Sequence, residues 1–420
     1  MPTLKEYEEL EKKEICCNLV GLEKFLERNH LSSALKITPS GIKARHYVGV
    51  IKYKNFQLQI LPKLIAENEA NKDKEKEQIL KNLVFMLSYT RKLDIKTADS
   101  VNLSKTQNPF LEVLIREFAL SLFDALKRLT PKNYIREEDN LNYLKGKIKF
   151  SENIRFNCVN KAKFYCEYDE FSENNILNQL FLYVATCLYE ISKNSENKRV
   201  LKLITDYFSD IKTRKFDKYD CNKIRLTRNQ KLFEKPFNLA KMFVENSSVD
   251  LSKNRIENIS LVWDMNKLFE EFIYQIIRTM NGVTVSAQSK KRLLQLGSKS
   301  YRDSLVDIMV NNKIVLDTKY KRFEGLDDVA NADIFQVSTY CMLHDKKHAI
   351  LLYPQWGKEK INKITNSIYC LNSPNDNNKI ELKFQSINLR LDLKTQLEEI
   401  KEELEGIISF TTPATTETES

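Results

Sequence analysis

Glycine is scarce in this chain of 420 residues. Only nine glycines occur, and the two closest, Gly41 and Gly49, are eight residues apart. A dinucleotide-binding fingerprint needs glycines two and three residues apart, and a P-loop needs two glycines five apart. The chain therefore cannot form either loop and has no predicted nucleotide-cofactor site. Any nucleoside triphosphatase that its biology requires has to be supplied by a partner.

Histidine is equally rare, with four residues in the chain. His344 and His348 are four apart, a spacing that would place them on one face of a helix. A zincin needs Glu directly after the first His, but Asp345 stands there. We therefore interpret the two histidines as polar residues of a surface turn.

Long apolar runs and paired cysteines are also missing. The eight cysteines include no Cys-x-x-Cys pair, and the first residues lack the apolar core of a signal peptide. No apolar run approaches the roughly 18 residues that span a bilayer. These features predict a cytoplasmic protein with reduced thiols and no membrane association.

The net charge of +10 is concentrated in two segments. Residues 212–231 contain eight basic and two acidic side chains, and residues 272–302 contain six basic and no acidic ones. Segments of this kind suit a phosphate backbone, although a solvated lysine-rich face is the alternative for each taken alone. For the second segment we predict DNA contacts, made by Lys290, Lys291, Arg292, Lys299 and Arg302.

Hydrophobic periodicity predicts a multidomain α/β protein. We expect a β-rich N-terminal domain at 1–70, a mainly helical central region at 71–254, an α/β domain at 255–395, and an acidic helix end with a disordered tail at 396–420. Within 255–395 the expected order is α-β-β-β-α-β. The expected elements are a helix at 264–280, strands at 283–286, 304–310 and 314–320, a helix at 333–343, and a strand at 349–353.

The main chemical signal is a carboxylate pair on the second and third strands of this domain. Three residues, Asn311 to Lys313, form the expected turn, which places Asp307 opposite Asp317, while Lys319 points to the same side. Two buried carboxylates repel one another unless a cation neutralises them. Mg²⁺ often uses one or two carboxylates together with a substrate phosphate. An exposed Asp–Lys ion pair is the alternative interpretation.

The flanking helices add further polar groups. Glu270 lies at the edge of an apolar helical stripe and can reach toward a neighbouring sheet, while Glu271 points nearly opposite and should be solvated. Gln336 and Tyr340 are four apart on the next predicted helix and share a side. Taken alone, each is more simply a helix-surface residue, but the whole series is more specific.

This series resembles the PD-(D/E)xK nuclease superfamily, although Val306 replaces the usual proline before the first aspartate. The segments 264–272, 315–321 and 333–340 resemble McrC, the nuclease subunit of McrBC-type and LlaJI-like restriction systems. Segments 47–50, 58–63 and 168–178 extend the resemblance upstream. It implies that Asp307, Asp317 and Glu270 bind Mg²⁺, for which Mn²⁺ can substitute, that Lys319 positions water, and that Gln336 orients the substrate or a ligand.

The resemblance also implies a partner, a McrB-like AAA+ GTPase that recognises DNA, receives the N-terminal region of McrC and is stimulated by it. Our first hypothesis is therefore a metal-dependent endonuclease subunit that cuts double-stranded DNA in a methylation-linked, antiviral restriction complex. The alternatives are a regulatory, DNA-binding adaptor that does not cut, and a repair nuclease of the same superfamily that acts alone.

Overall fold

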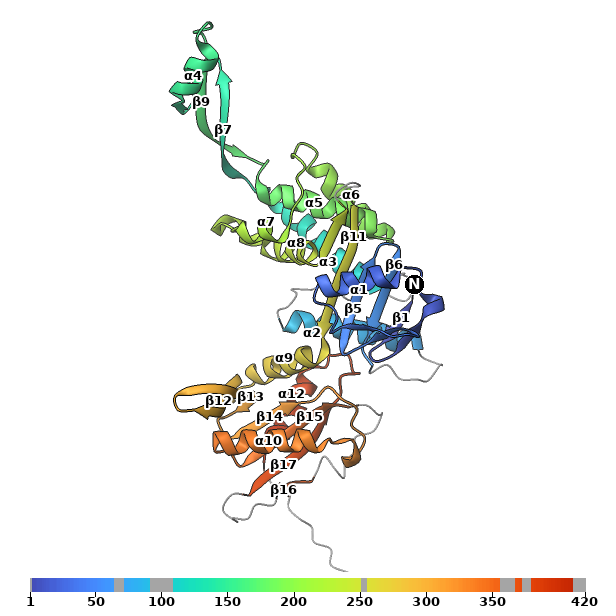
Figure 1. Ribbon diagram of the computed structural model, residues 1–420. Coiled ribbons are helices and arrows are strands. Elements are labelled where there is room, and N and C mark those ends of the chain that lie inside the picture. The colour runs from blue at the N-terminus through green and yellow to red at the C-terminus, as the bar shows by residue number, and fades with distance from the viewer. Residues whose placement is uncertain are drawn as a thin grey trace, which may run out of the picture. The chain divides into compact units, whose positions relative to one another are not determined.

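The computed structural model describes residues 2–63, 72–90, 109–250, 255–355, 367–371 and 379–410, and its fold is mixed α/β (Figure 1). The chain forms two compact units. The first unit comprises Met1–Val50, Phe56–Ser104 and Val262–Ser420. The second unit comprises Ile51–Asn55 and Lys105–Leu261.

Strands dominate the N-terminal part, where we expected a β-rich region. They are β1 (Thr3–Lys5), β2 (Glu9–Glu11), β3 (Leu35–Ile37), β4 (Gly41–Ala44), β5 (Tyr47–Tyr53) and β6 (Phe56–Leu61), with α1 (Leu19–Arg28) after β2. β6 ends immediately before Pro62, which cannot donate to a strand ladder. β1 pairs with β6 in parallel, whereas β2, β3 and β4 form a separate antiparallel sheet. The three-residue strands β1 and β2 were not predicted.

A six-stranded mixed sheet organises the rest of the first unit, in the order β12-β13-β14-β15-β17-β16. Its elements are α9 (Met265–Arg278), β12 (Val285–Leu296), β13 (Lys299–Val310), β14 (Ile314–Thr318), α10 (Asn331–His344), β15 (His348–Pro354), β16 (Tyr369–Leu371), β17 (Ile380–Ile387) and α12 (Leu397–Ile408). From α9 to β15 this is the predicted α-β-β-β-α-β order. The acidic C-terminal helix is α12, and the predicted tail lies outside the described residues.

The first two strands of this sheet are longer than predicted. We expected strands at 283–286 and 304–310, whereas β12 runs to Leu296 and β13 starts at Lys299. Polar and charged residues dominate the added segments, so they lack the apolar alternation of a half-buried strand. Backbone pairing between the two strands forms the ribbon instead.

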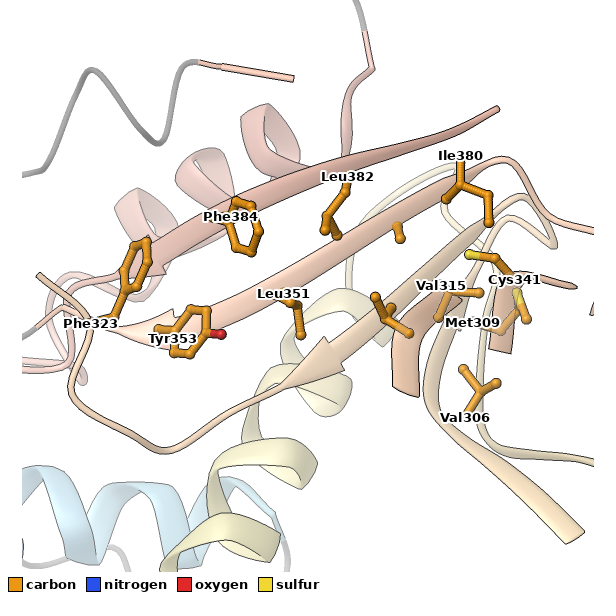
Figure 2. Close-up of a cluster of buried hydrophobic side chains, with 12 residues drawn as sticks. Val306, Met309, Val315, Phe323, Cys341, Leu351, Tyr353, Ile380, Leu382 and Phe384 are labelled. Carbon is orange, nitrogen blue, oxygen red and sulfur yellow. The ribbon is translucent and has the colours of Figure 1, made fainter. Parts of the chain in front are cut away.

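One face of the sheet buries a core beneath α10 (Figure 2). Phe323 stacks on Tyr353 with ring centroids 4.5 Å apart and lies near Phe384. Cys341 of α10 packs at the other end of this cluster, beside Val315. These contacts fix α10 against β14 and β15, the two strands that it connects.

Helix α2 (Lys72–Tyr89) packs against α9. Phe85 and Tyr89 both meet the ring of Phe272 edge-on. The buried amide of Asn82 donates to the carbonyl oxygens of Leu389 and Leu391, at 2.9 and 2.6 Å. α9 is therefore held in place by aromatic packing, while α2 is tied to the segment after β17.

The second unit combines a helical bundle with a strand ribbon. Its elements are α3 (Pro109–Arg128), β7 (Asn133–Leu141), β8 (Lys147–Ile148), α4 (Phe150–Asn157), β9 (Phe164–Ser172), α5 (Ile176–Ile191), α6 (Ser195–Tyr207), α7 (Lys218–Lys223), η5 (Arg228–Phe233), α8 (Glu234–Glu245), β10 (Ser247–Asp250) and the part of β11 (Arg255–Asp264) up to Leu261. Helices α5, α6 and α8 lie in the region that we expected to be mainly helical. The ribbon of β7 and β9 was not predicted.

Two buried asparagines join that ribbon to α5. The side chains of Asn175 and Asn178 both donate to the carbonyl oxygen of Pro131, at 2.8 Å. Asn175 also caps α5 by accepting from the backbone of Leu177 and Asn178. Asn175 and Asn178, which belong to the segment 168–178, therefore have a structural role.

The last features of the fold concern membrane-spanning helices and cysteine thiols. None of the helices in the described ranges combines the length and hydropathy needed to cross a membrane. All eight cysteines are free thiols, and four of them are buried.

Candidate active site

A tight turn sets the register of the β13–β14 hairpin. Val310 lies opposite Ile314, as predicted, and Lys313 closes the turn by donating its backbone N–H to the carbonyl oxygen of Val310 at 2.9 Å. Asn311 and Asn312 take φ angles of 50° and 51°. Asparagine adopts this left-handed region more readily than most residues because its short side chain can bond locally.

Asp307 lies where the hairpin ladder stops. Backbone pairing ends at Ile308 and Leu316, and the carboxylate of Asp307 instead accepts from Thr318, 3.1 Å from its backbone nitrogen and 3.4 Å from its hydroxyl. Burial raises the pKa of Asp307, although the bonds from Thr318 oppose this shift. Asp307 is therefore held beside the end of β14, but the predicted pair of Asp307 with Asp317 is not part of the ladder.

Asp317 is the most enclosed charged group of the site, with 0% of its surface exposed. Nζ of Lys319 lies 2.6 Å from its Oδ2. Burial, and next the negative charge of Asp307, raise the pKa of Asp317 to about 7 in spite of this lysine. The two carboxylates repel each other, as expected for acidic groups that share a buried site.

Lys319 links the strand to helix α10. Its backbone N–H donates to Leu352 at 2.9 Å, and its Nζ donates to Oε1 of Gln336 at 3.0 Å. Burial lowers the pKa of Lys319, but the surrounding carboxylates, first among them Asp317, together raise it more, so the net pKa is above its ordinary value. Nε2 of Gln336 donates to the hydroxyl of Tyr340 at 2.6 Å, which confirms that these residues share one side of the helix.

Asp333, on α10, is a further buried carboxylate of the site, and the sequence had not indicated a role for it. Lys321 donates to both of its oxygens, at 3.0 and 2.8 Å, and Lys319 lies 3.9 Å away. Asp333 precedes Gln336 by one helical turn, so it shares that face. The spacing of three residues between Asp333 and Gln336 was the sequence signal that could have identified Asp333.

Glu270 approaches the site from α9. Asp264 is the N-cap of this helix, and its side chain accepts from the backbone N–H groups of Asn266 and Lys267. Gln288 of β12 donates to Oε1 of Glu270 at 2.6 Å. Burial, and next the charge of Asp307, raise the pKa of Glu270. Glu271 is half-buried and not fully solvated as expected, and the role of Glu270 as a metal ligand stays a prediction.

The site offers two carboxylates to a cation. Neither oxygen of Asp317 has an aligned hydrogen-bond donor among the described residues, although Lys319 is within ion-pair distance. Within the same residues, no group of three or more His, Cys, Asp or Glu side chains is arranged to hold a metal. Mg²⁺ keeps several waters and commonly takes only one or two carboxylates. The donor set of Asp307 and Asp317 therefore fits Mg²⁺ better than a metal that needs a full protein cage.

Sequence comparison places this arrangement in a known family. The family described as "McrBC 5-methylcytosine restriction system component" matches residues 42–354, about three-quarters of the chain. The chain belongs to this McrBC family. No curated protein matches the sequence.

Two solved structures share the fold of this McrBC family member. The first is the refined half-complex from a tetradecameric assembly of Thermococcus gammatolerans McrB AAA+ hexamers with bound McrC. That match has 20% identity and a TM-score of 0.77, and it covers 97% of this chain and 99% of the other. The second is the Thermococcus gammatolerans McrBC complex determined by cryo-EM, with 24% identity, a TM-score of 0.54, and coverage of 66% and 87%.

The predicted DNA-contacting residues of this McrBC protein lie together on the β12–β13 ribbon. All are exposed: Lys290, Lys291, Arg292, Lys299 and Arg302. Nζ of Lys290 lies 2.8 Å from the carboxylate of Asp303. The role of these five residues in DNA binding stays a prediction.

The two spaced histidines do not share a helix. His344 ends α10 and His348 starts β15, and Asp345 between them has a left-handed φ of 54°. Nδ1 of His348 lies 3.1 Å from the carboxylate of Glu381. The two histidines therefore flank a turn, as we interpreted them.

Proposed function

We propose that this chain is the Mg²⁺-dependent nuclease subunit of a McrBC-type restriction complex and cuts double-stranded DNA with a PD-(D/E)xK site. The observation that carries the proposal is the convergence of Asp307, Asp317, Lys319 and Gln336 from β13, the β14 end and α10. The α-β-β-β-α-β order and the family match support it.

The two aspartates have the role of cation ligands in this proposal. Because burial raises both pKa values, and the charge of Asp307 raises that of Asp317 further, a divalent cation gains more from neutralising this pair than from an exposed pair. When bound, Mg²⁺ supplies a positive charge that activates water and stabilises charge on the phosphate. Asp307 and Asp317 hold that charge at the end of β14.

Lys319 has the role of positioning the attacking water and stabilising charge on the phosphate. It is charged, and its ammonium is restrained between Asp317 and Gln336, at 2.6 and 3.0 Å. Gln336 is restrained in turn by Tyr340. This chain of contacts keeps the ammonium close to the carboxylate pair, and such pre-organised positioning is what a displacement at phosphorus requires.

The proposed partner is a McrB-like AAA+ GTPase. The similar solved structures are of McrB AAA+ hexamers with bound McrC and of a McrBC complex. This chain has no glycines at P-loop spacing, so it cannot supply the GTP site itself. A division of labour follows, in which this chain cuts DNA and the partner hydrolyses GTP, stimulated by this chain.

The test compares substitutions at the site with matched substitutions outside it. Asp317→Ala and Lys319→Ala should each abolish DNA cleavage by the reconstituted complex and leave the stimulated GTPase intact. Asp327→Ala and Lys313→Ala change the same residue types at exposed positions and should cut normally. Normal cutting by both site variants would contradict the assignment.

A regulatory adaptor that binds DNA without cutting is the second candidate. The missing third acidic or histidine ligand among the described residues is the observation in its favour. Titrating Mg²⁺ or Mn²⁺ into the reconstituted complex separates the two. Metal-dependent nicking supports the nuclease, whereas metal-independent DNA binding without any nicking supports the adaptor.

A further inference from the structure

The outer part of the β12–β13 ribbon is exposed. Residues 291–299, which include its tip, are all exposed, and Gly297 turns the chain with a φ of 59°. Figure 1 shows the two strands continuing as a hairpin past the body of their sheet. An isolated two-stranded ribbon is only marginally stable in water. A ribbon of this length therefore suggests a binding partner.

Large apolar side chains at the tip are half or more exposed in the described structure. Leu293, Leu294 and Leu296 are 50%, 58% and 73% exposed. Tyr301 and Leu305 continue this exposed apolar surface on β13. Single exposed leucines are common, but a contiguous exposed group typically marks an interaction site.

The charge of the ribbon identifies the class of partner. Between Val285 and Leu305 there are five basic residues and one acidic residue, Asp303. Lys290 is the only one of the five within ion-pair distance of Asp303 in the described structure. Two such ribbons would repel each other, which disfavours a second copy as the occupant, whereas a polyphosphate backbone is attracted.

The open face of the ribbon leads to the carboxylate pair. Along β13, Ser304 and Val306 are buried while Leu305 is exposed, so strand alternation places Leu305 and Asp307 on the open face. Cross-strand pairing adds Lys290 and Arg292 to this face, opposite Leu305 and Asp303. At about 3.3 Å per residue, the eight steps along the strand from Asp307 to Lys299 extend roughly 26 Å.

We propose that this ribbon is a DNA-gripping arm, whose open face contacts backbone phosphates and whose leucine tip inserts between base steps of the duplex being cut. Apolar wedges of this kind partially unstack DNA, and a two-stranded ribbon is narrow enough to enter a groove. The inference rests on the proposed function, because it takes the DNA near Asp307 as the substrate.

The test measures DNA binding separately from cleavage. The full chain is mixed in EDTA with a fluorescent duplex, and its affinity is recorded by anisotropy at several salt concentrations. A triple variant, Leu293→Ser, Leu294→Ser and Leu296→Ser, should weaken binding about tenfold and leave the salt slope unchanged, since it removes no charge. Arg292→Gln should instead reduce the slope by about one.

Matched variants and a base-stacking probe complete the experiment. Leu326→Ser and Lys36→Gln change exposed residues elsewhere and should bind like the wild type. A duplex carrying 2-aminopurine should brighten with the wild-type chain and not with the triple variant. Equal melting temperatures establish that the triple variant is folded.

Three results would overturn the arm or the function separately. If the triple variant bound DNA and brightened 2-aminopurine as the wild type does, the DNA-gripping arm would be overturned, even if the complex cuts DNA normally. If the triple variant differed from the wild type in the sedimentation of the free chain but not in DNA affinity, the arm would also be overturned. The leucine tip would then bind a second copy of the chain. Metal-dependent cutting that persists in Asp317→Ala and Lys319→Ala would overturn the proposed active site while leaving the binding result standing.

Discussion

Nζ of Lys319 lies 2.6 Å from Oδ2 of Asp317 although that carboxylate is fully buried and has a pKa raised to about 7. A buried acid beside an ammonium is ordinarily held ionised. Here burial and the neighbouring Asp307 outweigh the lysine. The carboxylate pair therefore takes up a proton more readily than exposed aspartates do, and a divalent cation that replaces this proton would relieve the repulsion.

The first prediction concerns Gln336, whose Oε1 accepts from Lys319 at 3.0 Å. Gln336→Ala should lower the cleavage rate about 10- to 100-fold, because a hydrogen bond to a charged group contributes about 1.5–3 kcal/mol. DNA affinity in EDTA should not change. Single-turnover cleavage by the reconstituted complex measures the rate. Thr339→Ala, a half-buried position near the exposed Phe335 and Met342 of α10, is the matched control, and an equal loss there would indicate a general defect of the helix.

The second prediction concerns stability and the charge of Asp317. Its folded pKa is raised above the unfolded value of 3.8, so the stabilisation present below that value is lost as the pH rises through about 7. Asp317→Asn removes this loss, so its melting temperature should rise relative to the wild type on going from pH 5 to pH 8. Mg²⁺ should stabilise the wild type at pH 8 and not the variant. Equal Mg²⁺ stabilisation of both would argue against Asp317 as a ligand.

The third prediction concerns Glu6, a carboxyl outside the site. Burial raises its pKa to about 7, in spite of a 3.0 Å hydrogen bond from the backbone of Lys63. As for Asp317, a folded pKa above the unfolded one means that the protein loses stability as the pH rises from about 4.5 to about 7. Glu6→Gln should therefore be more stable than the wild type at pH 8 and close to it at pH 5. Thermal melts at both pH values measure this, and a pH-independent difference would contradict it.

The fourth prediction concerns the turn that sets the carboxylate register. Asn312 has a φ of 51°, which is strained for β-branched residues. Asn312→Val should destabilise the protein by about 1–2 kcal/mol, whereas Asn312→Gly should have little effect because glycine adopts this conformation freely. Urea unfolding of both variants gives the comparison. Equal destabilisation would mean that the side chain of Asn312 matters more than its backbone.

Local patterns in the sequence predicted much of the site. The stripe and N-cap of α9, the three-residue turn and the alternation along β14 all depend on residues a few positions apart. They were sufficient to bring Asp307, Asp317 and Lys319 together, and helical spacing aligned Gln336 with Tyr340.

Contacts between distant segments could not be predicted in this way. The bond from Gln288 to Glu270 depends on how β12 passes α9. The contact of Lys63 with the carbonyl oxygen of Tyr320 joins segments more than 250 residues apart. The length of the β12–β13 ribbon was missed for a related reason, since pairing between its strands replaces the apolar alternation that marks a half-buried strand.

The central claim is that the carboxylate pair and Lys319 form a metal-dependent DNA-cutting site. The most direct measurement is cleavage of a long duplex by the complex reconstituted with its GTPase, with and without Mg²⁺, for the wild type, Lys319→Ala and Lys313→Ala. Cutting by the wild type and Lys313→Ala that needs Mg²⁺, with a loss of at least about 10²–10³-fold in Lys319→Ala and unchanged GTPase stimulation, is the predicted result. Mg²⁺-independent cutting, or equal rates for all three proteins, would contradict the account.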